Sequence, residues 1–302
     1  MICVLPGLYI GSSSDTTDPQ LLRRDGITHI LTVDSETPKN VDSFHVKFVH
    51  VLDDSCADLL SCLPACLHFV KDALGTSGSA VLVHCHAGMS RSAAVVTAYL
   101  MNTENLTFQD AYTRLEIIKP DVKINEEFVN QLALFEAMGC EVDLTSPTYK
   151  QYRLQKVTEK YPELKKLPQE IFASDPSSMG KTADIIYRCR KCRRSLFRES
   201  SILNHVLGTG PTAFVHKKLT SVCALDTTKC TSYFVEPVQW MEEALLGVMD
   251  GQLLCPKCKC KLGSFNWYGE QCSCGRWVTP AFQVHKNRVD EVKAVQIRGI
   301  QS

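Results

Sequence analysis

The stretch that decides the fold of the first half of this chain reads His84-Cys85-His86-Ala87-Gly88-Met89-Ser90-Arg91, with Ser92 directly after it. It fits the pattern His-Cys-x5-Arg-Ser. The apolar run Ala80-Val81-Leu82-Val83 precedes it after turn-like residues and predicts a buried strand. The run of small residues 92–101 predicts a helix that begins at or near Ser92. A strand, a tight loop and a helix N-terminus are therefore expected in succession.

This succession of elements builds a site for an anion. Backbone N–H groups of the loop and of the first helical turn point at one spot, where the helix dipole adds partial positive charge. Gly88 lets the backbone approach a phosphate closely, and the planar fork of Arg91 can hold two phosphoryl oxygens. The same field favours the thiolate of Cys85 and makes it nucleophilic. A packed core thiol would explain neither the glycine nor the arginine, so the pattern predicts phosphoryl transfer through sulfur.

The loop resembles the signature loop of the cysteine-dependent protein tyrosine phosphatases. The run 87–92, together with Ala98-Tyr99-Leu100-Met101, is similar to their dual-specificity branch. We expect the phosphoryl group to bind to the loop residues His86, Ala87, Gly88, Met89, Ser90 and Arg91. The loop contains no Lys, which argues against multiply charged phosphoinositides as substrates. Proteins phosphorylated on tyrosine, serine or threonine are therefore the expected substrates.

Strands and helices alternate in the sequence before the loop. Residues 5–11 predict a strand entered through a turn, residues 28–33 and 44–51 predict two further strands, and residues 18–25 predict a short helix. This alternation predicts an α/β sandwich, and the resemblance, which covers roughly residues 1–140, implies the sandwich of the tyrosine phosphatases. We expect three parts in the chain: a catalytic domain at 1–145, a helical segment and linker at 146–184, and a small zinc-stabilised, mainly β domain at 185–302.

The reaction also needs an acid, because a leaving alkoxide or phenoxide must take up a proton. In the dual-specificity phosphatases the acid lies on a loop after a strand like 44–51, so the resemblance assigns this role to Asp53, with Asp54 as the alternative. We expect Cys85 to form a phosphocysteine while Asp53 protonates the leaving oxygen and then activates water. Ser92 is expected to hydrogen-bond the sulfur, or simply to cap the helix. No cofactor is expected in this chemistry.

The composition places the chain in a reducing compartment. Its 302 residues predict two domains, and 15 cysteines without a recognisable secretory signal indicate that thiols serve catalysis and metals rather than disulfides. The nucleus and cytoplasm are the expected location. No apolar run is long enough to predict a membrane span, so a membrane is not an expected partner. The oligomeric state stays open.

Nine of the cysteines lie after residue 180 and predict metal sites. The pairs Cys189-x2-Cys192 and Cys255-Pro256-Lys257-Cys258 have the spacing of zinc knuckles. We group these last two cysteines into one closed site with the close pair that follows them: Cys255, Cys258, Cys272 and Cys274. A second site would combine Cys189 and Cys192 with two of His205, His216, Cys223 and Cys230, of which we favour His205 and Cys230. Two structural zinc ions are therefore predicted.

The end of the chain carries a second resemblance. With the N-terminal loop, the run that begins Phe265-Asn266-Trp267-Tyr268 and ends at Trp277 resembles the dual-specificity phosphatases that have a C-terminal zinc-binding domain, including their yeast-like relatives. This resemblance covers nearly the whole chain. It implies two metal ions, a protein of the nucleus and cytoplasm, and a role in assembling the large ribosomal subunit that need not use phosphatase activity.

The charge of the chain is divided unevenly. Residues 1–180 contain 15 Lys and Arg against 23 Asp and Glu, whereas residues 181–302 contain 18 against 10. A dense basic cluster lies beside Phe197: Arg188, Arg190, Lys191, Arg193, Arg194 and Arg198. RNA phosphates or an acidic protein would suit it, and a solvated face is the alternative. Two functions stay open: an active phosphatase that docks to pre-60S ribosomal particles, and mainly a zinc-dependent ribosome-assembly factor.

Overall fold

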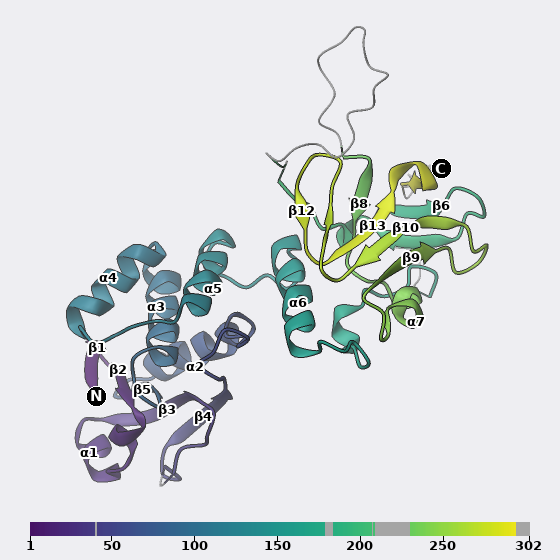
Figure 1. The fold of residues 1–302 in the computed structure, drawn as a ribbon. Helices are drawn as coiled ribbons and strands as arrows, with labels where there is room; N and C mark the ends of the chain where they lie inside the picture. Colours follow the sequence, from purple (N-terminus) through teal and green to yellow (C-terminus); the bar gives the residue numbers. More distant parts are fainter. Residues whose placement is uncertain (40, 179–183, 207, 209–229, 294–302) are drawn as a thin grey trace, which may run out of the picture. The chain divides into compact units, whose positions relative to one another are not determined.

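The computed structural model describes residues 1–39, 41–178, 184–206, 208 and 230–293 (Figure 1). The chain divides into two units, residues 1–143 and 144–302. Each unit has its own sheets and its own buried apolar cluster. None of the helices in the described part of the chain combines the length and the apolar character that a membrane crossing needs.

The first unit is built on a five-stranded sheet. Its strands are β1 (Ile2–Leu5), β2 (Leu8–Ser12), β3 (Ile27–Asp34), β4 (His45–His50) and β5 (Ala80–Cys85). They lie in the order β1-β2-β5-β3-β4, with an antiparallel β1–β2 pair and parallel pairing elsewhere. Every residue of β5 is buried, as expected for a central parallel strand. Cys85 therefore stands at the carboxyl end of the central strand, the edge where α/β sheets bind ligands.

Helices cover this sheet. They are α1 (Pro19–Arg24), α2 (Leu63–Gly75), α3 (Arg91–Glu104), α4 (Phe108–Ile118) and α5 (Glu126–Ala137), with the 3-10 helices η1 (Ser13–Thr16) and η2 (Leu60–Cys62). In Figure 1, α1 lies on one side of the sheet and α2–α5 lie together on the other. Residues 91–101 of α3 are all buried, because α3 packs against α2, α4, α5 and β5. This close packing leaves room only for small side chains, which explains the alanines at positions 93, 94 and 98.

The predicted α/β sandwich is confirmed, and strands are present at the positions predicted near 28–33, 44–51 and 80–83. The strand predicted at 5–11, entered through a turn, is confirmed as β2, which follows the turn at Pro6 and Gly7. The sequence did not predict its antiparallel partner β1. Gly7 has φ +82, a conformation that glycine adopts without strain. The run Ile2–Leu5 was too short to show a periodicity from which a strand could be predicted.

The second unit is mainly β, as predicted. It begins with α6 (Pro147–Lys160), and its strands are β6 (Ile186–Cys189), β7 (Ser195–Arg198), β8 (Ser232–Phe234), β9 (Asp250–Leu254), β10 (Lys261–Asn266), β11 (Glu270–Gln271), β12 (Trp277–Val278), β13 (Ala281–His285) and β14 (Val289–Val292). Its short helices are η3 (Gln169–Ile171), η4 (Glu199–Ser201), η5 (Gln239–Met241), α7 (Glu242–Leu245) and η6 (Lys286–Arg288). The strands form three sheets, in the orders β14-β6-β7, β8-β13-β10-β9 and β11-β12.

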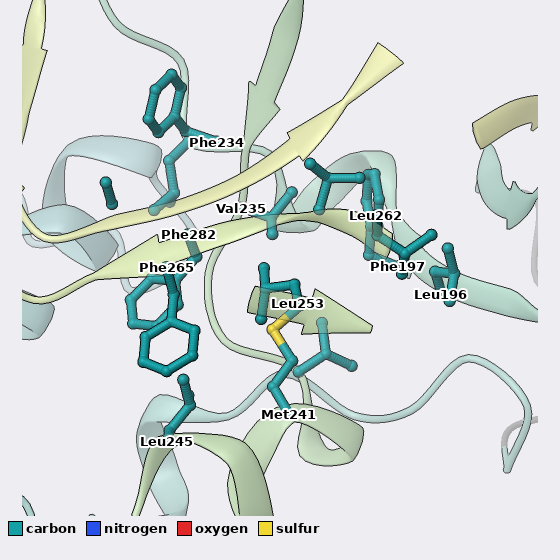
Figure 2. Packing of buried hydrophobic residues seen from close by; sticks show 14 of the residues in the cluster. Leu196, Phe197, Phe234, Val235, Met241, Leu245, Leu253, Leu262, Phe265 and Phe282 are labelled. Carbon is teal, nitrogen blue, oxygen red and sulfur yellow. The ribbon is translucent and has the colours of Figure 1, made fainter. Parts of the chain in front are cut away.

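Aromatic side chains fill the core of the second unit. Figure 2 shows Phe265 and Phe282 from the neighbouring strands β10 and β13, with Phe234 from β8 close by. The Phe265 and Phe282 rings stack with their centroids 6.4 Å apart. Phe197 of β7 belongs to the same buried cluster. One core therefore joins the two larger sheets.

Helix α6 belongs to this second core. Leu154 and Val157 are buried in the cluster that contains Phe234, and Lys150 forms an ion pair with Glu236 at 2.8 Å. This arrangement differs from the prediction. We expected a helical segment and linker at 146–184 that is separate from a zinc-binding domain beginning at residue 185. The core partners of α6 lie far along the chain, so the sequence showed its apolar positions but not the surface that they cover.

Gln131 of α5 holds the segment that leads from Asp53 into α2. Its buried side chain accepts hydrogen bonds from the N–H groups of Leu59 (2.8 Å) and Leu60 (2.9 Å), and donates one to the carbonyl of Ala57 (2.7 Å). These three bonds cross between segments that are distant in the sequence. They fix the backbone beyond the predicted acid.

We expect Gln131→Met to lower the free energy of unfolding by about 2–4 kcal/mol, because two buried N–H groups and a carbonyl lose their partners. Urea denaturation measures this change. The control is Asn130→Ala, an exposed position on the same helix, which should alter stability little. Equal stability of Gln131→Met and the parent protein would contradict the expectation.

Candidate active site and metal centres

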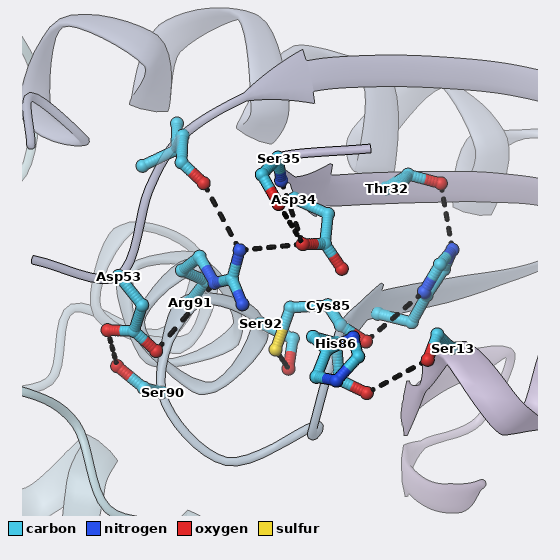
Figure 3. A network of polar contacts seen from close by, with 12 residues as sticks. Ser13, Thr32, Asp34, Ser35, Asp53, Cys85, His86, Ser90, Arg91 and Ser92 are labelled. Atoms are coloured by element: carbon cyan, nitrogen blue, oxygen red, sulfur yellow. Dashed lines mark hydrogen bonds and ion pairs between the residues drawn. The ribbon is translucent and has the colours of Figure 1, made fainter. Parts of the chain in front are cut away.

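The loop between β5 and α3 encloses the sulfur of Cys85. Ser92 Oγ lies 3.2 Å from Cys85 Sγ (Figure 3). The Gly88 N–H donates to the same sulfur at 3.3 Å. Gly88 has φ +72, and a Cβ there would lie 2.6 Å from the carbonyl oxygen of Gly11. Only glycine fits this position. The Gly88 N–H, the Ser92 hydroxyl and the N-terminus of α3 thus all face the sulfur.

Arg91 closes the loop from a buried position. Its Nη1 donates to Asp34 Oδ1 at 2.7 Å and to the carbonyl of Val51 at 3.2 Å (Figure 3). Its Nε is buried and has no hydrogen-bond partner among the described residues. An unpaired buried N–H is costly, so the Nε side of the guanidinium is the side that a phosphoryl oxygen would satisfy.

Asp53 stands at the mouth of the loop. Its Oδ1 accepts from Ser90 Oγ at 2.8 Å, and its Oδ2 lies 3.7 Å from Arg91 Nε (Figure 3). The side-chain amide of Asn125 also donates to Oδ1. Asp54 accepts instead from the N–H of Cys56 at 2.9 Å. Of the two candidate acids, the structure therefore brings Asp53 to the loop. The proton-transfer role of Asp53 stays a prediction.

The rest of the loop is tied to its surroundings through carbonyl groups. The carbonyl of His86 accepts from the N–H and Oγ of Ser13, both at 3.1 Å, and the carbonyl of Met89 accepts from the N–H of Lys123 at 2.9 Å. Ala87 is exposed. These outside bonds fix the conformation of the loop before any substrate arrives.

His84, the residue before Cys85, holds the start of the loop through hydrogen-bond contacts of its imidazole. Its Nε2 lies 2.8 Å from Thr32 Oγ1, and its Nδ1 lies 3.5 Å from the carbonyl of Cys85. Burial lowers the pKa of His84, so the imidazole stays neutral at pH 7. A neutral ring keeps one donor and one acceptor nitrogen, which is what a bridge between these two groups needs.

Two cavities flank Arg91 and Asp53. One of about 590 Å³ is lined by Asp34, His86 and Arg91 together with hydroxyl residues of η1 and of residues 35–37. The other, of about 550 Å³, is lined by Asp53, Ser90 and residues 123–126 and 129. Both open beside the loop, so the site has room for chain on either side of a phosphorylated residue.

The second unit brings eight metal-ligating side chains into two clusters. The first contains Cys189, Cys192, Cys255 and Cys258, and the second contains His205, Cys230, Cys272 and Cys274. Within each cluster the ligand atoms all lie within 4.8 Å of one another. All eight residues were predicted as ligands. Of the four candidates for completing the site of Cys189 and Cys192, His216 and Cys223 lie outside the described residues.

The predicted grouping of these ligands is wrong. We grouped Cys255 and Cys258 with Cys272 and Cys274, but the structure places them with Cys189 and Cys192. The reason is strand β10, which runs between the two pairs: its six residues span about 20 Å and carry the second pair away from the first. His205 and Cys230 therefore join Cys272 and Cys274 rather than Cys189 and Cys192.

The two knuckles of the first cluster have the same backbone. The N–H of Arg193 donates to the carbonyl of Cys189 at 2.8 Å, and the N–H of Lys259 donates to that of Cys255 at 2.9 Å. Both donors have positive φ, +63 and +55. Each turn thereby aims its two sulfurs at a common point.

Both clusters suit a metal ion that prefers soft donors. Cys189 Sγ lies 3.7 Å from Cys258 Sγ, and Cys192 Sγ lies 3.5 Å from Cys255 Sγ. Tetrahedral bonds of about 2.3 Å to a metal would put the sulfurs about 3.8 Å apart, close to these separations. In the second cluster, Cys230 and Cys274 each place Sγ 3.4 Å from His205 Nε2. A fifth thiol, Cys260, lies 3.3 Å from Cys258 Sγ.

The basic cluster of the second unit is largely paired. Arg190 and Arg193 both contact Asp290, Arg194 contacts Asp175, and Arg198 contacts Asp184. Phe197, which we expected beside a nucleic-acid surface, is fully buried in the core and cannot stack on a base. Lys191 is exposed on the first knuckle. The surface available to an anionic partner is therefore smaller than the sequence suggested.

Three residues of the active site were missed in the sequence: Asp34, Ser90 as the partner of Asp53, and Asn125. Asn125 offered one signal, because it has the position of a helix cap, and it does accept from the N–H of Phe128 at 2.8 Å. Asp34 offered a signal too, as a carboxylate that directly follows the strand predicted at 28–33. Neither signal indicates which active-site residue the side chain would contact.

Comparisons with known proteins identify the family of this chain. Among solved structures, human DUSP28 has a TM-score of 0.43 and 31% identity, over 45% of this chain and 93% of that one. The family model for "Dual specificity phosphatase, catalytic domain" matches residues 8–138. Tyrosine-protein phosphatase YVH1 of Saccharomyces cerevisiae is 30% identical, over 95% of this chain and 90% of that protein. Dual specificity protein phosphatase 12 of Homo sapiens is 59% identical, over 100% of this chain and 92% of the human protein. The chain therefore belongs to the dual specificity protein phosphatase 12 family and is a protein tyrosine/serine/threonine phosphatase.

Proposed function

We propose that the chain hydrolyses phosphotyrosine and phosphoserine or phosphothreonine in proteins through a phosphocysteine intermediate on Cys85. The observation that carries this proposal is the environment of the sulfur, which faces Ser92 Oγ at 3.2 Å and the Gly88 N–H at 3.3 Å. A sulfur surrounded by donors at a helix N-terminus is a good nucleophile and a good leaving group. Arg91, beside it, has a buried N–H without a partner among the described residues.

The reaction proceeds in two steps. In the first, the sulfur of Cys85 attacks phosphorus, the bond to the leaving oxygen breaks, and the proton of Asp53 passes to that oxygen. Loop N–H groups and Arg91 stabilise the charge on the phosphoryl oxygens. In the second, Asp53 takes a proton from water, the water oxygen attacks phosphorus, and the sulfur–phosphorus bond breaks. Ser92 donates a hydrogen bond to the departing sulfur.

We expect Asp53→Asn to lower kcat for a phosphoserine peptide by about 100-fold, because the amide fits the same hydrogen bonds but has no proton to give. The loss should be smaller for an aryl phosphate whose leaving group is stable as an anion. Steady-state kinetics on the two substrates measure both effects. The control is Asp54→Asn, which should keep full activity. A larger loss in the control would transfer the acid role to Asp54.

Each metal cluster is proposed to hold one zinc ion. Cys189, Cys192, Cys255 and Cys258 would hold the first, and His205, Cys230, Cys272 and Cys274 the second. What supports zinc is the donor set, four soft ligand atoms at tetrahedral separations with no position left for a substrate. The ions would tie the turns of the second unit together and take no part in phosphate hydrolysis.

The second unit is further proposed to dock the protein to precursors of the large ribosomal subunit, in the nucleus and the cytoplasm. The support is the resemblance of nearly the whole chain to phosphatases with this role and the excess of positive charge after residue 180. Lys191, Lys257 and Lys259 are exposed around the first cluster and offer contacts to RNA phosphates or an acidic protein. Docking that persists in a variant without phosphatase activity would make the binding role the principal one.

A further inference from the structure

Asp34 is a buried carboxylate that the reaction described above does not use. It is the last residue of β3, the parallel neighbour of the strand that ends at Cys85. Its side chain is only 8% exposed. A carboxylate is rarely buried unless a specific partner compensates the loss of water. Its position at the active edge of the sheet suggests that this partner matters for function.

The partner is Arg91. Asp34 Oδ1 accepts from Arg91 Nη1 at 2.7 Å, and the N–H of Ser35 donates to the same oxygen at 2.8 Å (Figure 3). The carbonyl of Val51 accepts from Nη1 as well, at 3.2 Å. One corner of the guanidinium is therefore held by two acceptors from two different segments of the unit. Because the guanidinium is planar, the two hydrogen bonds at Nη1 also fix the direction in which the Nε side of the group faces.

A second carboxylate competes for the same arginine. Asp53 Oδ2 lies 3.7 Å from Arg91 Nε, too long for a hydrogen bond but within reach of a small rotation. If the guanidinium turned toward Asp53, it would cover the nitrogen that must meet the phosphoryl oxygens. It would also pair with the group that must give up a proton. The bond to Asp34 holds Arg91 away from this closed arrangement.

We propose that Asp34 is a positioning residue for the phosphatase reaction: it clamps one corner of Arg91 so that the Nε side faces the phosphoryl group and does not close onto Asp53. This inference rests on the proposed role of Arg91 in binding the phosphoryl oxygens. Asp34 itself touches no reacting atom.

Two substitutions of Asp34 separate the effect of its negative charge from the effect of its hydrogen-bond acceptor. Asp34→Asn keeps the size and one acceptor oxygen, and should lower kcat for a phosphotyrosine peptide by about 10-fold. Asp34→Ala removes the acceptor and should cost about 100-fold, the effect of losing one oriented donor to the transition state. Inhibition by vanadate, which binds as the five-coordinate phosphorus would, should weaken by the same factors. The control is Glu104→Gln, which removes the carboxylate that pairs with Arg114 elsewhere in this unit.

A double-mutant cycle with Arg91→Lys decides whether Asp34 acts through Arg91. A lysine cannot offer the planar fork, so Asp34→Asn should change kcat less than about 2-fold in the Arg91→Lys background. If the two losses multiply instead, Asp34 affects activity through general folding and the inference is overturned. If Arg91→Lys alone keeps full activity, the proposed role of Arg91 fails. Thermal unfolding of each variant shows that the compared proteins are folded.

Discussion

We expect Cys85→Ser to abolish turnover of a phosphotyrosine peptide, by at least about 10⁴-fold in kcat, and to leave the fold and the binding of the peptide intact. The expected size follows from the chemistry of the nucleophile, because removing the attacking atom removes the covalent route altogether. A serine hydroxyl is a much weaker nucleophile than a cysteine sulfur, so the same loop cannot replace the lost attack. The side chain keeps nearly the same volume, and Ser92 and Gly88 still face it.

The measurement pairs kinetics with binding. Steady-state turnover gives the loss in kcat, and titration of the peptide into Cys85→Ser should give an affinity close to the KM of the parent protein. The matched control is Cys56→Ser, an exposed thiol in the same unit, which should keep full activity. Unchanged turnover by Cys85→Ser would defeat the phosphocysteine mechanism.

The centre of the active site could be predicted because its parts are contiguous in the sequence. β5, the loop and the start of α3 occupy residues 80–92 without interruption. The apolar run, Gly88 and the small residues of the helix therefore each predicted a local structure that the protein has. The order of elements then placed the sulfur at a helix N-terminus. No long-range information was needed for this step.

The parts that were missed depend on which strands become neighbours. Asp34 reaches Arg91 because β3 pairs with β5, although many residues separate the two strands in the sequence. The ligand pairs were found from their spacing, but their grouping depends on where β10 carries the chain. A spacing rule describes one turn, whereas a four-ligand cluster needs two turns brought together by the sheets. For the same reason the sequence could not place α6 in the second core.

Removing the first metal cluster should disable the second unit and spare the first. Cys255 is fully buried and belongs to the apolar core of the second unit. A structural zinc ion contributes about 10–16 kcal/mol of apparent binding energy, while a whole domain is stable by only about 5–15 kcal/mol. We therefore expect the double variant Cys255→Ser/Cys258→Ser to bind one zinc ion fewer per chain and to show no cooperative unfolding transition for this unit. It should also no longer bind pre-60S particles. Phosphopeptide turnover should persist, since the catalytic residues all lie before residue 143.

Metal content by mass spectrometry, calorimetry and co-sedimentation with the particles measure these outcomes. Cys260→Ser is the matched control: it removes the thiol beside the cluster and should keep two zinc ions and particle binding. Replacing all four of Cys255, Cys258, Cys272 and Cys274 tests the grouping, because the structure predicts that both ions are lost, whereas the grouping by sequence spacing predicts that one remains. If the zinc-free protein still bound the particles, docking through the second unit would be refuted. If phosphopeptide turnover were lost together with the zinc, the two units would not act independently.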